Sequence, residues 1–122
     1  MKHVLLVDDS PTLLMSMASV LERSGYGVTK AASGEEGLTQ MRTKPFALVI
    51  TDYNMPGING VEMIREARRL PNARFTPMLL LTTESEQKKR DDAKAAGATG
   101  WLVKPVPADK LLQVLKQVIP GA

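Results

Sequence analysis

The chain has 122 residues, of which 43% are hydrophobic and 24% charged, and its formal net charge is +3. This length fits a single domain over residues 1–122, and the composition is that of a globular protein, not of a disordered chain. The lack of cysteine excludes disulfides and thiolate metal sites. The first apolar stretch is too short for a secretory signal, and no apolar run reaches the length of about 18 residues that a membrane span needs. We therefore expect a cytoplasmic protein with no membrane partner.

The basic residues are dispersed among acidic ones along the chain, as in KKRDD at residues 88–92. This arrangement is typical of a solvated surface of mixed sign, whereas a nucleic-acid-binding protein carries a basic stripe. We therefore expect no nucleic-acid partner.

The first predicted strand covers residues 3–7, where HVLLV leads directly into Asp8 and Asp9. A helix follows: Ser10 is a suitable N-cap, Pro11 suits the first helical position, and Gly25 lies near the expected end. Its core-facing stripe has four residues at positions i, i+3, i+4 and i+7, namely Leu14, Met17, Ala18 and Leu21.

Three other apolar residues of the first helix lie outside this stripe: Val20, and near the start of the helix Leu13 and Met15. Leu13 and Met15 either dock a helix of a partner protein or pack against the last helix of the same chain. The sequence leaves both alternatives open.

The middle of the chain predicts strands over residues 27–31 and 46–51 and two helices. One helix lies between Ser33, which can cap its start, and Pro45, which cannot continue it. The other runs from about residue 61 to residue 70. Its apolar side chains recur on successive turns, at Val61, Ile64 and either Ala67 or Arg68.

The last third of the chain predicts strands over residues 77–82 and 99–103 and helices over residues 85–97 and 107–119. The helix over residues 85–97 offers only alanines as apolar anchors, so it should be the most weakly anchored helix. It is either mobile or simply a solvent-exposed helix. The final helix has strong apolar periodicity, carried by Leu111, Leu112, Leu115, Val118 and Ile119.

Strands and helices alternate along the chain, which predicts an α/β fold with a parallel sheet covered by helices on both faces. In such a sheet, ligands bind at the carboxyl ends of the strands. Polar residues follow or end four of the five strands, namely Asp8 and Asp9, Asp52, Thr82 and Thr83, and Lys104. Each has an ordinary explanation by itself; the first two aspartates, for example, could favour the helix dipole. As a set they predict one site.

Three carboxylates close together repel one another, and a single lysine leaves the site with a formal charge of −2. A divalent cation would balance that charge, and Mg²⁺ is the best candidate because it prefers hard oxygen ligands and keeps waters that a phosphoryl group can displace. A carboxylate beside a metal ion, a hydroxyl and an ammonium can form an aspartyl phosphate. We take Asp52 as the nucleophile, because Asp8 and Asp9 are paired as metal ligands are.

Four segments carry a resemblance to a known family: VDDS at 7–10, TDYNMPGINGVE at 51–62, LTTES at 81–85 and GATGWLVKPV at 97–106. Together they resemble the receiver domains of two-component response regulators, most closely the stand-alone chemotaxis regulators of the CheY type. The resemblance covers the whole chain. It implies a flavodoxin-like (βα)5 three-layer sandwich with strand order 2-1-3-4-5, an order for which CheY is itself a standard example.

The resemblance also implies roles for the residues at the sheet edge. Asp8, Asp9, Asp52 and the backbone carbonyl of Asn54 would bind Mg²⁺. Asp52 would accept a phosphoryl group from a histidine of a sensor kinase, while the Thr82 hydroxyl and the Lys104 ammonium would bind phosphoryl oxygens. The bond from Lys104 to Pro105 would be cis, an isomer almost confined to proline.

At two further positions the residue differs from the one usual in the family, and two others affect how readily water attacks the phosphoryl group. Trp101 would occupy the aromatic switch position and turn inward when Thr82 moves toward the phosphate; the alternative is a permanently buried core tryptophan. Thr83 stands where the family usually has a smaller residue and could narrow access to the phosphoryl group. Asn54 and Glu84 occupy positions that tune attack by water.

The implied function is a phosphorylation-controlled binding module and not an enzyme that acts on a separate substrate. Its partners would be a sensor histidine kinase or histidine phosphotransfer domain and a downstream target such as a flagellar switch component, and the chain would act as a monomer. A phosphorelay shuttle and a receiver domain cut from a longer regulator are open alternatives.

Two other classes of protein share part of this pattern. Phosphatases of the haloacid dehalogenase type also use an aspartyl nucleophile with Mg²⁺. Their nucleophile follows the first strand, and a second aspartate stands two residues after it. In this chain Asp8 has the first of these positions, but Ser10 has the second. A flavodoxin-like flavin site is disfavoured because the turn after the first strand is acidic.

Overall fold

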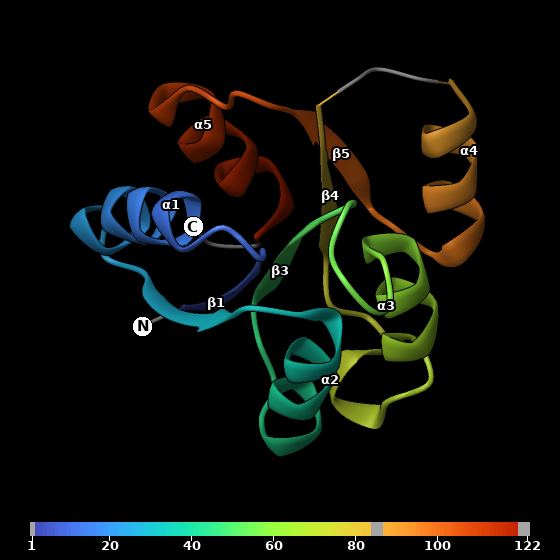
Figure 1. Ribbon diagram of the computed structural model, residues 1–122. Helices are drawn as coiled ribbons and strands as arrows, with labels where there is room; N and C mark the ends of the chain where they lie inside the picture. Colours follow the sequence, from blue (N-terminus) through green and yellow to red (C-terminus); the bar gives the residue numbers. More distant parts are fainter. Residues whose placement is uncertain (1, 84–86, 120–122) are drawn as a thin grey trace.

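The computed structural model describes residues 2–83 and 87–119 (Figure 1). Its strands are β1 (His3–Val7), β2 (Gly27–Ala31), β3 (Leu48–Asp52), β4 (Met78–Thr82) and β5 (Gly100–Val103). Its helices are α1 (Pro11–Arg23), α2 (Gly34–Thr43), α3 (Gly60–Ala67), α4 (Gln87–Ala96) and α5 (Ala108–Val118), with a short 3-10 helix η1 (Pro71–Ala73) before β4. The strands pair in parallel in the order β2-β1-β3-β4-β5, which confirms the predicted fold class.

The sheet has helices on both faces, with α1 and α5 on one side and α2, α3 and α4 on the other (Figure 1). Strand β1 therefore needs apolar side chains in both directions. Val4 and Leu6 pack beneath α1 and α5, whereas Leu5 and Val7 pack beneath the other helices. Each fully buried side chain of this size stabilises the fold by about 1.5–3 kcal/mol. This two-sided burial explains why the strand reads as a continuous apolar run.

Helix α1 begins and packs as its sequence predicts. The Ser10 hydroxyl accepts a hydrogen bond from the Leu13 backbone N–H at 3.3 Å, and Pro11 occupies the first turn. All four residues of the predicted stripe are buried. Leu13 is half-buried against the core beneath α1 and α5, whereas 68% of Met15 is exposed. Packing within the chain therefore accounts for Leu13 but not for Met15.

The third strand differs from the prediction, since it covers Leu48–Asp52 and not residues 46–51. The register explains the shift: Leu48 pairs with Val4, near the start of β1, so residue 46 has no neighbouring strand to join. At the other end Asp52 pairs with Leu81 of β4 and belongs to the strand. The phosphoacceptor candidate is thus held by the sheet itself.

The remaining boundaries lie close to their predicted positions except at α3, which ends at Ala67 where the pattern predicted about residue 70. Beyond it the side chain of Arg68 turns inward to bind backbone carbonyls. Helix α4 has only alanines among its buried described side chains, Ala93 and Ala96, as its composition predicted. Residues 85 and 86 of the predicted fourth helix lie outside the described residues. Among the described helices, none is both long and apolar enough to cross a bilayer.

Candidate functional site

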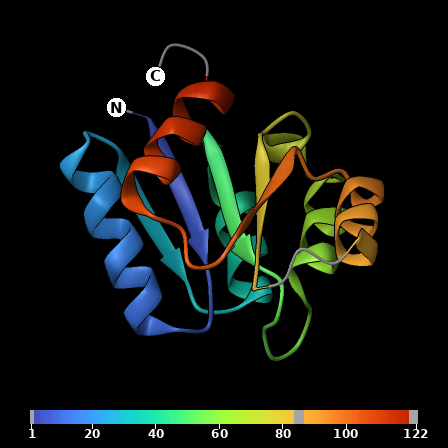
Figure 2. The same ribbon diagram turned by 90° about the horizontal axis from the view of Figure 1, so that it is seen from above.

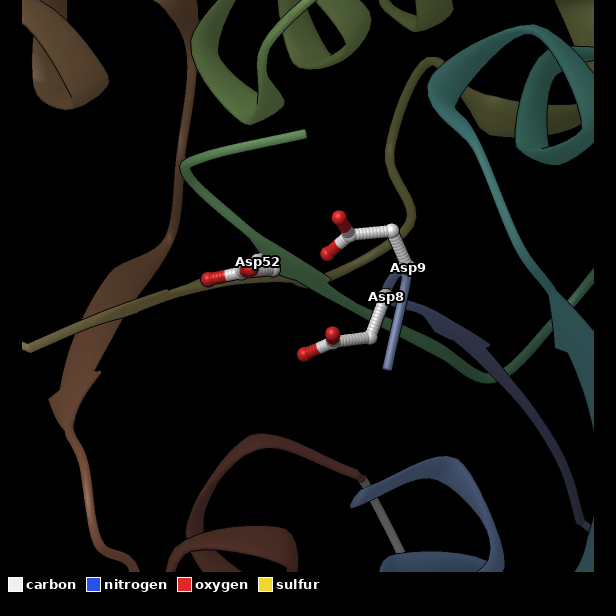
Figure 3. A group of neighbouring side chains, drawn as sticks. All are labelled: Asp8, Asp9 and Asp52. Carbon is white, nitrogen blue, oxygen red and sulfur yellow. The ribbon is translucent and has the colours of Figure 1, made fainter. Parts of the chain in front are cut away.

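Three carboxyl groups meet at the carboxyl ends of the two central strands, β1 and β3. Asp8 and Asp9 directly follow β1, and Asp52 is the last residue of β3. Figure 3 shows all three side chains projecting to the same side, and one oxygen from each lies within 4.8 Å of the others. Asp8 and Asp52 are buried, while Asp9 is exposed. The strand order therefore brings together side chains that lie 44 positions apart in the sequence.

The turn after β1 holds Asp8 in place. Its Oδ1 accepts a hydrogen bond from the Ser10 backbone N–H at 2.9 Å, directly before α1 begins. Asp8 thus also satisfies a donor at the start of the helix, as the helix-dipole explanation requires. This local role coexists with its place in the carboxylate group.

Asp52 is held by two donors on one oxygen. Its Oδ1 accepts hydrogen bonds from the Tyr53 backbone N–H at 2.9 Å and from Lys104 Nζ, also at 2.9 Å. These contacts orient the carboxylate. Among the described residues, no hydrogen-bond donor to Oδ2 is found, so this oxygen is the freer of the two.

Lys104 links the carboxylates of both strands. Its Nζ lies 2.9 Å from Asp52 Oδ1 and 3.3 Å from Asp8 Oδ2. The backbone N–H of Lys104 donates to the Thr82 carbonyl at 2.7 Å, which positions the residue directly after β5. The bond from Lys104 to Pro105 is cis, as predicted.

The charges of the site act on one another. Burial raises the pKa of Asp52, and the neighbouring charge of Asp8 raises it further; the hydrogen bonds from Lys104 and Tyr53 lower it but do not cancel the effect. For Lys104, burial alone would lower the pKa, but the hydrogen bond and charge of Asp52, together with Asp8, raise it overall. The lysine therefore keeps its positive charge, while the ionised form of Asp52 is disfavoured.

The carboxylate group fits a small divalent cation. Its members are hard oxygen donors gathered within 4.8 Å, and three carboxylates with one ammonium leave a formal charge of −2. Mg²⁺ and Ca²⁺ prefer such ligands, whereas zinc and copper favour nitrogen and sulfur. Asp8, Asp9 and Asp52 are the residues that could hold the ion.

The other predicted site residues surround this group. Thr82 ends β4 and is buried, and Thr83 is exposed beside Lys104 in a groove between α1 and α5. Asn54 is exposed in the loop after β3. Glu84 lies outside the described residues. The predicted roles of these residues in binding metal or phosphate stay predictions.

Trp101 lies on β5 and is 37% exposed, with the guanidinium carbon of Arg90 on α4 at 5.1 Å from its ring centre. The alternative of a permanently buried core tryptophan is therefore wrong. The indole lies outside the core, and its role as a switch stays a prediction.

Gly60 is a residue of this region that the sequence reasoning missed. The Tyr53 carbonyl accepts a hydrogen bond from the Gly60 N–H at 3.0 Å, which draws the start of α3 against the end of β3. A Cβ at position 60 would overlap the backbone oxygen of Asp52. The only available signal was the glycine-containing turn after Asn59, which does not reveal what the glycine faces.

The family model for the response regulator receiver domain matches residues 4–116. This chain belongs to the response regulator receiver domain family. Protein PilH of Pseudomonas aeruginosa is 32% identical to this receiver domain over 121 residues, which cover 99% of this chain and 100% of PilH.

Solved receiver structures share the fold over nearly the whole chain. The structure of chemotaxis protein CheY4 of Vibrio cholerae has 41% identity and a TM-score of 0.95, covering 98% of this chain and 99% of its own. The receiver domain of the sensor histidine kinase PA1611 of Pseudomonas aeruginosa has 27% identity and a TM-score of 0.89, covering 96% of each chain. In that structure a magnesium ion is coordinated in the active-site cleft.

Proposed function

We propose that this receiver domain accepts a phosphoryl group on Asp52 from a phosphohistidine of a sensor histidine kinase or histidine phosphotransfer domain. The observation that carries the proposal is the setting of Asp52. This buried carboxylate ends a central strand, 2.9 Å from a lysine ammonium and beside two further carboxylates. An ordinary surface aspartate has neither the burial nor the partners.

The reacting atom is assigned to Oδ2 of Asp52, because Oδ1 already accepts two hydrogen bonds. Oδ2 attacks phosphorus, the bond from phosphorus to the histidine nitrogen breaks, and the electron pair stays on the imidazole. Lys104 Nζ remains protonated and close enough to bind a phosphoryl oxygen.

Asp8, Asp9 and Asp52 would hold Mg²⁺, together with the backbone carbonyl of Asn54. A bound Mg²⁺ would neutralise negative charge on the phosphoryl oxygens. The magnesium ion in the PA1611 receiver domain supports this assignment.

The signal would leave through a change at Thr82 and Trp101. We propose that the Thr82 hydroxyl binds the phosphoryl group and that Trp101 turns inward from its exposed position. Phosphorylation need only shift an equilibrium between two conformations for a partner to distinguish them. The weakly anchored α4, which carries Arg90 over the indole, would move with it.

The partner proteins follow from the class of regulator. The resemblance to PilH and to the chemotaxis protein CheY4 supports a role in chemotaxis-type signalling, with a target such as a flagellar switch component. The chain would act as a monomer and would catalyse only its own phosphorylation and dephosphorylation. A groove of about 540 Å³ between α1 and α5, lined by Leu13 and Lys104 among others, opens beside the site and would receive part of the phosphodonor protein.

The decisive experiment is incubation with acetyl phosphate and Mg²⁺, followed by a phosphate-affinity gel and by the emission of Trp101. Wild type should be retarded on the gel, and its emission should shift to shorter wavelength as the indole becomes buried. Asp52→Asn should show neither change. Asp91→Asn changes an exposed aspartate on α4 in the same way and is the matched control for the gel.

Two outcomes separate the parts of this proposal. Equal retardation of wild type and Asp52→Asn would reject Asp52 as the acceptor. Retardation of wild type without any change in emission would leave the acceptor in place and reject Trp101 as the switch.

A further inference from the structure

The positive charge of this chain is concentrated at one end of the molecule. Residues 39–47 and 65–77 contain six basic residues and one acidic residue, Glu66. Because the net charge of the whole chain is +3, the remaining residues carry a net −2. The basic residues of the two segments are Arg42, Lys44, Arg65, Arg68, Arg69 and Arg74.

The fold joins these two segments, which are separated in the sequence. The side-chain nitrogen of Asn72, in η1, donates to the carbonyls of Met41 and Arg42 at the end of α2, at 3.3 and 3.4 Å. Figure 1 shows η1 lying beside α2. Figure 2 shows the loop from α3 to β4 at the edge of the sheet where the strands begin, opposite to their carboxyl ends. The basic segments thus lie at the far edge from Asp52.

Hydrogen bonds from the side chain of Arg68 hold the loop between α3 and β4 in place. The guanidinium donates to the carbonyls of Ala73 at 2.8 Å and Thr76 at 2.7 Å, and also to that of Gly97, before β5, at 2.8 and 3.0 Å. The side chain of Phe75, within this loop, is nevertheless 91% exposed. Because these hydrogen bonds fix the backbone of the loop, the exposure of the phenyl ring is a property of the folded loop.

Four exposed arginines lie in the same two segments as Phe75, and we call this set of five residues the basic face. Arg74 lies with its guanidinium carbon 5.6 Å from the Phe75 ring centre. Among the described residues, none of the four forms an ion pair with a carboxylate. The members of the basic face are Arg42, Arg65, Arg69, Arg74 and Phe75.

We propose that the basic face binds the surface of an anionic phospholipid bilayer. A cluster of unpaired basic side chains is attracted to anionic headgroups, and an exposed phenyl ring can insert at the boundary of headgroups and acyl chains. Such binding needs no membrane-spanning helix. The single aromatic ring also distinguishes the face from a nucleic-acid site, in which several aromatic side chains stack on successive bases.

The shape of the face favours a bilayer over a partner protein. The Phe75 side chain is 91% exposed, so the ring needs a soft or hollow counterpart on whatever binds it. A bilayer provides one without matching its shape. Binding in this orientation leaves Asp52, at the opposite edge, accessible to other proteins.

The test is sedimentation with vesicles of phosphatidylglycerol and phosphatidylcholine in equal parts, compared with vesicles of phosphatidylcholine alone. Wild type should sediment with the anionic vesicles only, and less so as salt is raised. Arg74→Glu should lower the partition coefficient on the order of tenfold, and Phe75→Ala by roughly fivefold. Lys110→Glu on α5, which makes the same change in net charge elsewhere on the surface, should bind as wild type does.

Three results would overturn the proposal. The first is no binding to anionic vesicles, and the second is an equal loss in Lys110→Glu and Arg74→Glu, which would show an effect of net charge alone. The third is full vesicle binding by Phe75→Ala together with tight binding of soluble polyglutamate, which would indicate an acidic protein as the partner. Asp52→Asn should bind vesicles as wild type does, so failure of the proposed phosphoacceptor leaves this test unaffected.

Discussion

The Asp52 carboxyl group illustrates at the scale of one residue how burying an ionisable group lowers the stability of the fold. Burial, with the charge of Asp8, raises its pKa in the folded protein. The folded state therefore holds the proton more tightly than the unfolded state does. Below the ordinary pKa of an aspartate both states are protonated and no penalty exists; as pH rises through the raised pKa, the penalty for ionisation develops in full.

Asp52→Asn should therefore stabilise the protein at neutral pH when a chelator removes divalent cations. The gain should be present at pH 7, should shrink as the pH falls through the raised pKa of Asp52, and should vanish below the ordinary range of aspartate. Urea denaturation at several pH values, followed by Trp101 emission, measures it. Glu66→Gln, which removes an exposed carboxylate on α3, should show no such trend. A gain that is the same at acidic and neutral pH would contradict the assigned pKa direction.

At the scale of secondary-structure elements, the start of α3 is fitted against the end of β3. Gly60→Ala should destabilise the protein by about 1–3 kcal/mol and slow phosphorylation, because the added Cβ must displace the Asp52 backbone. Alanine is otherwise the better helix former, so a loss reports the overlap itself. Denaturation and the phosphate-affinity gel measure the two effects.

Gly100→Ala is the matched control for this substitution. Its Cβ would lie 3.5 Å from Leu79 Cδ2, an ordinary packing distance. If both alanine variants are phosphorylated at the wild-type rate, the close approach of α3 to Asp52 does not affect phosphorylation.

Arg68 joins elements that are distant in the sequence, since it binds carbonyls in the loop before β4 and the turn before β5. Arg68→Met keeps much of the side-chain length but removes the guanidinium hydrogen bonds to these carbonyls. We expect a loss of about 2–4 kcal/mol in the free energy of unfolding, measured in urea. Arg69→Met alters an exposed neighbour and should change stability by less than about 0.5 kcal/mol. Equal effects would show that the inward hydrogen bonds are unimportant.

At the scale of the whole molecule, cation binding at the carboxylate site would be coupled to folding. In the unfolded chain Asp8, Asp9 and Asp52 separate, so a cation that needs all three binds the folded state and stabilises it. Mg²⁺ at a hundred times its dissociation constant should stabilise the protein by about 2.7 kcal/mol. A thermal melt with and without Mg²⁺ tests this.

Two variants distinguish a specific site from a general salt effect. Asp9→Asn removes the exposed carboxylate of the proposed ligand set and should abolish most of the Mg²⁺-dependent shift in Tm. Glu36→Gln removes an exposed carboxylate from α2 and should leave the shift intact. A shift that survives Asp9→Asn unchanged would remove Asp9 from the proposed ligand set.

Much of the fold and of the candidate site was predictable because its signals are local. The apolar run of β1, the Ser10 cap with Pro11, and the buried stripe of α1 depend on residues within a few positions of one another. The parallel sheet then brings the strand ends together, so Asp8, Asp9, Asp52 and Lys104 could be assigned to one site. The strand order itself came from the resemblance to receiver domains, because periodicity alone does not rank the strands.

Only the tertiary structure decided features that depend on the path of the chain through space. Arg68 reads as one basic residue among several, yet it points inward and donates to the carbonyls of Ala73, Thr76 and Gly97. The glycine at position 60 faces Asp52, and Trp101 lies outside the core. The basic segments 39–47 and 65–77 are separated in the sequence, but they lie together because the side chain of Asn72 joins the loop after α3 to the end of α2. Local patterns determine which elements form, whereas contacts between distant segments determine which side chains meet.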